Sequence, residues 1–200
     1  MIVGIMHRIL LHTCCGPCTI IPVERLRERD WYVHGFFFNP NIHPYQEFGR
    51  RLDTLRSFAL GVDLPLIVHD DYDLDSFLRQ TVFREQQRCT ICYSLRLEAA
   101  ARLARKSRFD AFTTTLLYSR HQKHDLAVEI ARQASLKFGI PFYYEDFRSG
   151  WKEGQERSRT LGMYRQQYCG CIYSERDRFH GGTGKPADRN EARRKQGPPK

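Results

Sequence analysis

The chain has 200 residues, 41% of them hydrophobic, which suffices for one domain with a core of its own and leaves too little for a second. No apolar run approaches the roughly 20 residues of a membrane span, and the N-terminal stretch has no signal-peptide cleavage site, so we expect a soluble, cytoplasmic protein without a membrane partner. The formal net charge is +9, but residues 176–200 carry eight Lys or Arg against three Asp or Glu, which leaves only +4 for residues 1–175 and does not establish a basic surface there.

Residues 8 to 171 alternate between apolar runs and segments of helical spacing. The first run, Arg8 to Thr13, is compact and apolar, as expected of a strand that is buried on both faces of a parallel sheet. Further strands are predicted at residues 31–38, 64–69, 109–117 and 141–145. Helices are predicted at residues 17–29, 45–60, 93–106, 125–138 and 151–167, with another that begins near Leu74. This alternation favours a single α/β domain, with a mainly parallel sheet flanked by helices and right-handed crossovers.

Two stretches lie outside this alternation. Asp70 to Asp73 precede the helix that begins near Leu74, and we interpret them as caps of that helix, because carboxylates offset the helix dipole there. Beyond Tyr173 the apolar spacing dissolves into a glycine-rich, basic sequence. We therefore expect a domain over residues 1–174 and a disordered basic tail over residues 175–200.

Seven cysteines form three tight groups. They are Cys14, Cys15 and Cys18 after the first strand, Cys89 and Cys92 before the helix 93–106, and Cys169 and Cys171 near the end of the domain. A disulfide scaffold usually spreads an even number of cysteines along the chain, and adjacent cysteines are awkward partners. Metal ligation or redox chemistry is therefore the better interpretation.

The first group stands where a reactive centre is expected. Gly16-Pro17 forces a turn after the first strand, and the fixed φ of Pro17 suits the first turn of a helix. The thiols then lie at the carboxyl end of a strand and near a helix N-terminus, which favours thiolate over thiol. Because open α/β sheets bind ligands at that edge, the three cysteine groups can converge there.

The spacing favours an iron–sulfur cluster over structural zinc. Two Cys-x-x-Cys pairs suit a tetrahedral zinc ion better than adjacent cysteines do, whereas neighbouring thiolates can each hold a different iron of a cubane. The predicted ligands of a [4Fe–4S] cluster are Cys14, Cys15, Cys89 and Cys92. Cys18, Cys169 and Cys171 remain for a second metal or a dithiol, although some thiols can equally be small buried residues.

Three other functions fit part of the pattern. Cys15-Gly16-Pro17-Cys18 has the active-site spelling of a thioredoxin-like dithiol oxidoreductase, but five further cysteines and about five βα units argue against it. A cluster-dependent tRNA-thiolating enzyme should carry a glycine-rich nucleotide loop after the first strand, and Gly16 alone does not make one. A zinc-bearing RNA-binding module explains the thiols and the charge, but it does not explain why seven cysteines would surround one cleft.

Five separated motifs stand in order along the chain. They are His12-Thr13-Cys14-Cys15-Gly16-Pro17-Cys18, Phe38-Asn39-Pro40-Asn41-Ile42-His43-Pro44, Arg88-Cys89-Thr90-Ile91-Cys92-Tyr93, Thr114-Thr115-Leu116-Leu117-Tyr118-Ser119-Arg120-His121-Gln122 and Tyr164-Arg165-Gln166-Gln167-Tyr168-Cys169-Gly170-Cys171. In these motifs, and from about Arg8 to Ser174, the chain resembles the QueH family of cobalamin-independent epoxyqueuosine reductases. Five motifs in the same order make this resemblance specific.

The resemblance implies an oxidoreductase that removes the epoxide oxygen of epoxyqueuosine at the wobble position of a tRNA to give queuosine, with an unidentified electron donor. It implies a nucleotide-hydrolase-like (Rossmann-like) sheet, a [4Fe–4S] cluster and a second, mononuclear iron. Cys18 would then serve catalysis as a ligand of the second metal, with Cys169 and Cys171 as plausible partners. The division of the seven thiols between the two metals stays open.

Such a reaction needs an acid beside the metal. An epoxide opens when a Lewis acid polarises its oxygen, and the net change takes two electrons and two protons. His12, His121 and Tyr168 are the candidate proton donors, and each can equally be a structural side chain. For His43 the structural role is the favoured interpretation.

Basic and aromatic residues near the predicted site are candidates for binding the tRNA. Arg120, Lys123, Arg148, Lys152 and Arg165 are candidates for phosphate contacts, with solvated surface charge as the alternative for each. Tyr118, Phe147 and Trp151 are candidates for stacking on an anticodon base. Such a base must leave its own stack before chemistry can reach it.

Overall fold

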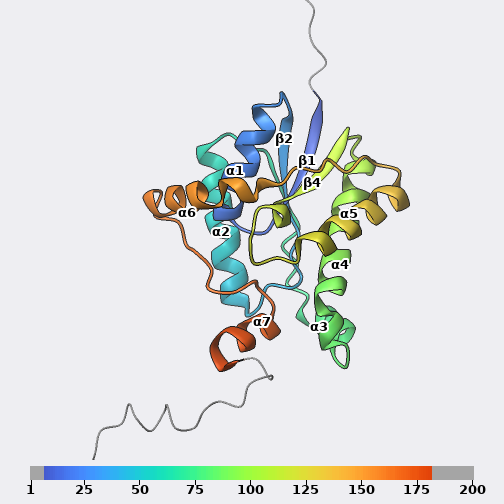
Figure 1. Ribbon diagram of the computed structural model, residues 1–200, viewed down its shortest axis with the longest axis vertical. Helices are drawn as coiled ribbons and strands as arrows, with labels where there is room; N and C mark the ends of the chain where they lie inside the picture. The colour runs from blue at the N-terminus through green and yellow to red at the C-terminus, as the bar shows by residue number, and fades with distance from the viewer. Residues whose placement is uncertain (1–6, 182–200) are drawn as a thin grey trace, which may run out of the picture.

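The structure, a computed structural model, describes residues 7–181 and contains a four-stranded parallel sheet (Figure 1). The strands are β1 Arg8–Thr13, β2 Tyr32–Phe37, β3 Leu66–Val68 and β4 Ala111–Thr114. They lie in the order β3-β2-β1-β4, with Arg8 of β1 opposite Tyr32 and Ile9 opposite Ala111. The predicted parallel α/β sheet is confirmed, and the first strand has the predicted bounds.

Helices cover both faces of the sheet (Figure 1). On one side lie α1 Gly16–Arg27, α2 Tyr45–Gly61 and α6 Trp151–Thr160. On the other side lie α4 Arg88–Lys106 and α5 His124–Phe138. Shorter helices are α3 Leu74–Thr81 and α7 Ile172–Arg176, and 3-10 turns span Glu85–Gln87, Thr115–Leu117 and Phe147–Gly150. None of the helices among the described residues is long and apolar enough to cross a membrane.

The central strand β1 packs against both helical layers. Ile9 and Leu11 belong to the apolar cluster that contains the inner residues of α1, whereas Leu10 packs with Ala100 and Ala104 of α4. All three β1 side chains are fully buried. Successive side chains of a strand point to opposite faces, and burying each contributes about 1.5 to 3 kcal/mol. An apolar strand without polar alternation is therefore stable only between two layers of helices.

Two predicted elements end early. The strand predicted at residues 141–145 is reduced to one parallel bridge between Phe112 and Phe142, because the chain then leaves β4 for a 3-10 turn that the Asp146 carboxylate caps. The helix predicted over residues 151–167 ends at Thr160, and Gly162 follows with φ at +61°. Residues 161–171 are therefore free to cross the site as an extended segment.

The end of the domain also differs from its predicted boundary. A boundary at residue 174 falls inside α7, and a π-helical turn continues to Gly181. The Arg88 guanidinium donates to the Asp177 carboxylate at 2.5 Å, which fastens this turn to the start of α4. Helical structure therefore extends beyond the expected start of the tail. The remainder of the expected tail, residues 182–200, lies outside the described residues.

One predicted helix start is confirmed, and the start of α4 lies five residues earlier than the predicted residue 93. Asp73 caps α3, since its carboxylate accepts a hydrogen bond from the Ser76 N–H at 3.0 Å. Cys89 and Cys92 lie in the first turns of α4. Both cysteines therefore lie near a helix N-terminus, as the sequence predicts.

The strand order creates a crevice between the ends of β1 and β4. The chain passes from β1 to β2 and β3 on one side and places β4 on the other side of β1. In open α/β sheets ligands bind outside the carboxyl ends of the strands at such a point. Here the Cys14 N–H after β1 donates to Thr115 Oγ1 after β4 at 3.3 Å, which joins the two strand ends.

Candidate metal centre

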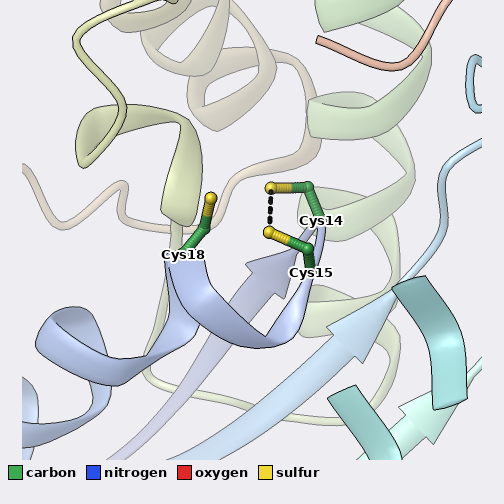
Figure 2. Close-up of side chains that lie close together, drawn as sticks. All are labelled: Cys14, Cys15 and Cys18. Carbon is green, nitrogen blue, oxygen red and sulfur yellow. Dashed lines mark hydrogen bonds between the residues drawn. The ribbon is translucent and has the colours of Figure 1, made fainter. Parts of the chain in front are cut away.

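Three thiols of the first motif lie together where β1 passes into α1 (Figure 2). Cys15 is the N-cap of α1, Pro17 occupies its first turn, and Thr19 Oγ1 donates back to the Cys15 carbonyl at 2.7 Å. This tight start places Cys18 one turn into the helix and turns its sulfur toward Cys14 and Cys15. We call Cys14, Cys15 and Cys18 the first thiol group.

The sulfur atoms of the first thiol group face one space. All three lie within 4.8 Å of one another, and Cys14 Sγ and Cys15 Sγ are 3.8 Å apart. Cys15 and Cys18 are buried and Cys14 is half-buried. Thr115 Oγ1 donates to Cys14 Sγ at 3.4 Å. Among residues 7–181 these are the only three metal-ligating side chains gathered so closely.

The three thiols differ in acidity. Hydrogen bonds from Cys15 and Cys18 lower the pKa of Cys14 well below its usual value. Burial raises the pKa of Cys15, and hydrogen bonds to Cys14 and Cys15 raise that of Cys18. Cys14 is therefore the most acidic of the three thiols. Metal binding has to release the thiol protons, because a ligating cysteine is deprotonated.

The other four cysteines form a second thiol group. Cys92 and Cys171 share one apolar cluster, with Cys89 packed against it. The pKa of Cys92 is raised to about 12, mainly by burial, with smaller contributions from the charges of Cys169, Cys171 and Cys89, while Arg96 acts in the opposite direction. Cys89, Cys92, Cys169 and Cys171 thus lie in one region, although among the described residues no three of them approach one another as closely as Cys14, Cys15 and Cys18 do. The structure places Cys18 with Cys14 and Cys15, whereas the spacing had suggested Cys18 with Cys169 and Cys171.

Two glutamine amides donate to the sulfur atoms. Gln166 Nε2 lies 3.1 Å from Cys15 Sγ and 3.5 Å from Cys18 Sγ, and Gln122 Nε2 lies 3.3 Å from Cys169 Sγ. The Gln122 amide is itself oriented, because its Oε1 accepts from Tyr93 OH at 2.8 Å. N–H donors of this kind stabilise thiolates and tune the potentials of iron–sulfur centres.

A cavity of about 380 Å³ opens beside both thiol groups. Cys14, Cys18 and Cys169 contribute to its wall, together with four glutamines and two arginines, Gln122, Gln155, Gln166, Gln167, Arg165 and Arg178. No Asp or Glu lines it, so the wall suits a polar or anionic ligand. A larger hollow of about 660 Å³ over α3 is lined by no thiol.

The candidate proton donors occupy different places. His121 lines the cavity, with its ring 5.4 Å from that of Trp151. Tyr168 also lines it, but its hydroxyl donates to the His43 carbonyl and burial raises its pKa to about 12. His12 is fully buried, and its ring nitrogens contact Thr114 Oγ1 at 2.9 Å and the Phe38 carbonyl at 3.2 Å. Burial lowers the pKa of His12 to about 3, so these contacts favour a structural role for it.

The candidate RNA-binding residues also differ in whether they line the cavity, lie exposed near it, or are paired with a carboxylate. Trp151 and Arg165 line the cavity, and Arg120 and Lys123 are exposed on the loop that supplies His121 and Gln122. Arg148 forms two hydrogen bonds with the Asp146 carboxylate, at 2.8 and 2.7 Å, and this ion pair balances its charge.

Two of the proposed stacking residues are corrected by their burial. Tyr118 and Phe147 are both 0% exposed. They pack in the apolar cluster of α1 and cannot stack on a base.

Residues that carry no thiol complete the site; the sequence analysis missed Arg51, whereas Gly170 stands in one of the recognised motifs. Arg51 is buried in α2, and its Nη1 and Nη2 donate to the carbonyls of Cys169 and Tyr168 at 2.9 and 3.0 Å. Gly170 has φ at +142°, and a Cβ there would lie 3.1 Å from Asn41 Nδ2. Glycine between the two cysteines is thus required by backbone conformation and by space.

Buried donors near the thiols fit a bound metal–sulfur group. Arg96 Nη2 and Asn41 Nδ2 are buried donors without an acceptor in the described part of the chain. Buried polar atoms are almost always satisfied. Thiolates and sulfides of a bound cluster are acceptors that such donors can use. The residues present therefore fit an iron–sulfur group.

Known proteins match almost the whole domain. The family model described as epoxyqueuosine reductase QueH matches residues 9–177. The epoxyqueuosine reductase QueH of Dehalococcoides mccartyi is 35% identical over 179 residues, which cover 90% of this chain and 96% of that protein. The QueH of Thermotoga maritima is 31% identical over 179 residues, covering 84% and 91%.

Solved structures share the fold at low identity. A protein of Methanocaldococcus jannaschii described as a predicted subunit of tRNA methyltransferase gives a TM-score of 0.53 at 11% identity, over 76% of this chain and 74% of that one. The U34-tRNA thiolase NcsA of Methanococcus maripaludis, solved with its [4Fe-4S] cluster, gives a TM-score of 0.55 at 14% identity, over 84% and 61%. At these identities the likeness concerns the arrangement of sheet and helices only.

Proposed function

This chain belongs to the epoxyqueuosine reductase QueH family, and we propose that it reduces epoxyqueuosine at the wobble position of a tRNA to queuosine. The epoxide takes up two electrons and two protons, its two C–O bonds break, a C=C bond forms and the oxygen leaves as water. The observation that carries this function is the match of residues 9–177 to the family, combined with cysteine thiols that face one cavity at the sheet edge.

A [4Fe–4S] cluster and a second iron are the cofactors that this function requires. We assign the cluster to the first thiol group, so that Cys14, Cys15 and Cys18 would hold it beside the cavity. The second thiol group, Cys89, Cys92, Cys169 and Cys171, then holds the mononuclear iron. Bound iron supplies the electrons and the Lewis acid that polarises the epoxide oxygen. Seven free thiols suit a reducing compartment such as the cytoplasm.

The residues of the chain bind the substrate and handle protons. The cavity beside Cys14 and Cys18 has no carboxylate and presents Arg165, which suits a nucleotide whose phosphates are anionic. Trp151 offers a half-exposed ring at the same wall for stacking on the extruded base. His121 is the proton donor that we favour, since it is exposed at the cavity, whereas the Tyr168 hydroxyl is already used.

The partners follow from the reaction. One partner is a tRNA with a queuosine-type anticodon, and the other is a protein or small molecule that donates electrons. Arg120 and Lys123 extend the cavity wall outward as exposed cations, where they can contact phosphates of the anticodon loop.

The test is turnover of epoxyqueuosine-containing tRNA by protein reconstituted with iron and sulfide without oxygen, with a chemical reductant. The expected product is queuosine, one oxygen atom lighter than the substrate nucleoside. Cys15→Ser should lose both the brown colour and turnover. Protein loaded with zinc is the matched control, because zinc has no redox chemistry. Unchanged substrate with a fully loaded cluster would refute the function, as would a Cys15→Ser variant that keeps colour and activity.

A further inference from the structure

Two arginines are among the largest fully buried side chains of the described residues, and their partners differ. Arg51 is 1% exposed and Arg96 is 2% exposed. Arg51 has Glu47 as its counter-ion, with 2.7 Å between Nε and Oε1. Arg96 forms no ion pair with a carboxylate anywhere in residues 7–181. A buried guanidinium without a counter-ion is strongly unfavourable, so an anion of another kind is expected beside Arg96.

The contacts of Arg96 leave one end of its guanidinium unused. Nε donates to the Cys92 carbonyl at 3.2 Å, and Cζ lies 5.5 Å from the centre of the Tyr93 ring. Nη2 is buried and has no acceptor among the described residues. A carbonyl and an aromatic face are dipoles and carry no net charge. They therefore orient Arg96 without neutralising it.

Cysteines of both thiol groups act on the charge of Arg96. Burial alone would lower the pKa of Arg96, but the nearby Cys92 and Cys169, then Tyr93 and Cys14, raise it. Cys92 and Cys169 belong to the second thiol group, and Cys14 belongs to the first. The Cys92 carbonyl accepts from Arg96 Nε one helical turn before Arg96, so the cysteines of the candidate metal site are the nearest source of an anion for this cation.

We infer that Arg96 is the counter-charge of the metal–thiolate site, donating Nη2 N–H groups to that site and raising its reduction potential. This role rests on the proposed function. Each added electron increases the negative charge of a thiolate-bound iron centre, so a fixed cation beside it stabilises the reduced form. Arginine suits this place because it stays charged at every physiological pH and presents several donors.

The test compares three variants of α4 under anaerobic conditions. Arg96→Met removes the charge at similar length, Arg96→Lys keeps the charge, and Arg105→Met removes an exposed arginine from the same helix. Each protein is reconstituted with iron and sulfide, and its midpoint potential is measured by redox titration. For Arg96→Met we expect the equilibrium constant of one-electron reduction to fall at least tenfold, which is a shift of about 59 mV to more negative potential. Arg96→Lys should retain most of the native potential, and Arg105→Met all of it.

A native potential in a fully loaded Arg96→Met protein would overturn the inference. If that variant does not assemble the iron site, zinc binding decides instead. Metal-free Arg96→Met should unfold at or above the wild-type temperature, because a buried charge has been removed, and its zinc affinity should be at least tenfold weaker. Lower stability of the metal-free variant with native zinc affinity would show a purely structural arginine and refute the inference. If wild-type protein assembles no iron site, the proposed function fails, and the zinc comparison still decides the role of Arg96.

Discussion

Side chains other than cysteine contact the sulfur atoms and belong to this site as much as the cysteines do. Gln166 and Gln122 each donate an amide N–H to thiol sulfur, from segments 44 residues apart in the chain. Both glutamines lie within motifs that the sequence analysis recognised, but an amide carries no charge or reactivity that marks it as a donor to sulfur. Arg96 could have been recognised from the sequence as a residue near the site, since it lies four residues after Cys92 and therefore on the same face of a helix.

Replacing Gln166 by leucine tests the sulfur hydrogen bonds. Gln166→Leu keeps the size of the side chain and removes the donor to Cys15 and Cys18. We expect the iron-loaded protein to lose about 1.5 to 3 kcal/mol of stability, the usual worth of a hydrogen bond to a charged group, and its potential to become more negative.

The neighbouring glutamine provides the control for this measurement. Gln167 is exposed, and its amide donates only to the Arg165 carbonyl, at 3.4 Å. Gln167→Leu should leave denaturant unfolding and the midpoint potential unchanged. Equal behaviour of the two variants would contradict a role for the Gln166 hydrogen bonds.

At the scale of elements, the extended segment 161–171 is held in place by α2. Arg51 donates to two carbonyls of this segment, and Glu47 accepts from both Arg51 and Tyr164 OH. The segment carries Gln166 and Cys169 into the site. The buried Arg51–Glu47 pair therefore positions part of both thiol groups.

Breaking this pair should be costly. Arg51→Met leaves the Glu47 carboxylate buried without a cation, which costs about 3 to 5 kcal/mol in denaturant unfolding. The double variant Arg51→Met with Glu47→Gln removes the uncompensated charge and should recover part of that loss. A single variant as stable as wild type, or a double variant no better than the single one, would show that the pair does not hold the segment.

The elements themselves differ in how far the sequence predicts them. β1 is predicted with its bounds because the compact apolar run Ile9-Leu10-Leu11 closely precedes the turn formed by Gly16-Pro17. The helix that begins at Trp151 was extended to Gln167, although Gly162 is a helix stop that the pattern already contained. The strand at Pro141 fails for a tertiary reason, since aromatic β-formers do not reveal where the chain must leave the sheet edge.

The sequence predicts the grouping of the cysteines only in part. Their spacing predicts metal binding and their place at helix starts, and both Cys89 and Cys92 lie in the first turns of α4. Which groups meet depends on how segment 161–171 crosses the sheet edge, and that path is fixed by Arg51 and by Gly170 at φ +142°. Neither the hydrogen bonds of Arg51 nor the backbone conformation of Gly170 can be recognised from the spacing of residues in the sequence.

At the scale of the whole molecule, exposed arginines should contribute more to the affinity for RNA than arginines that are paired with a carboxylate. Arg120 is exposed beside the cavity, whereas Arg148 is paired with Asp146. We expect Arg120→Ala to weaken tRNA binding and to reduce the slope of log affinity against log salt by about one, as the loss of one phosphate contact does.

Arg148→Ala is the matched control, since Asp146 already occupies its charge. It should leave both the affinity and the salt slope close to wild type. Both quantities come from a series of tRNA titrations at increasing salt. An unchanged slope for Arg120→Ala, or a larger change for Arg148→Ala, would place the RNA on another surface.

The arrangement of the molecule brings all seven cysteines to one edge of a small sheet. β1 delivers the first thiol group, α4 delivers Cys89 and Cys92, and segment 161–171 closes over them with Cys169 and Cys171. The cavity opens between these elements, so a substrate in it would contact both thiol groups at once.

A single turnover without external reductant tests this account most directly. Protein is loaded with iron and sulfide, reduced, freed of excess reductant and mixed anaerobically with epoxyqueuosine-containing tRNA. The account predicts that the protein is reoxidised as queuosine forms, with two electrons lost for each queuosine. A reduced protein that keeps its electrons in the presence of this tRNA, or queuosine formed without reoxidation of the protein, would contradict it.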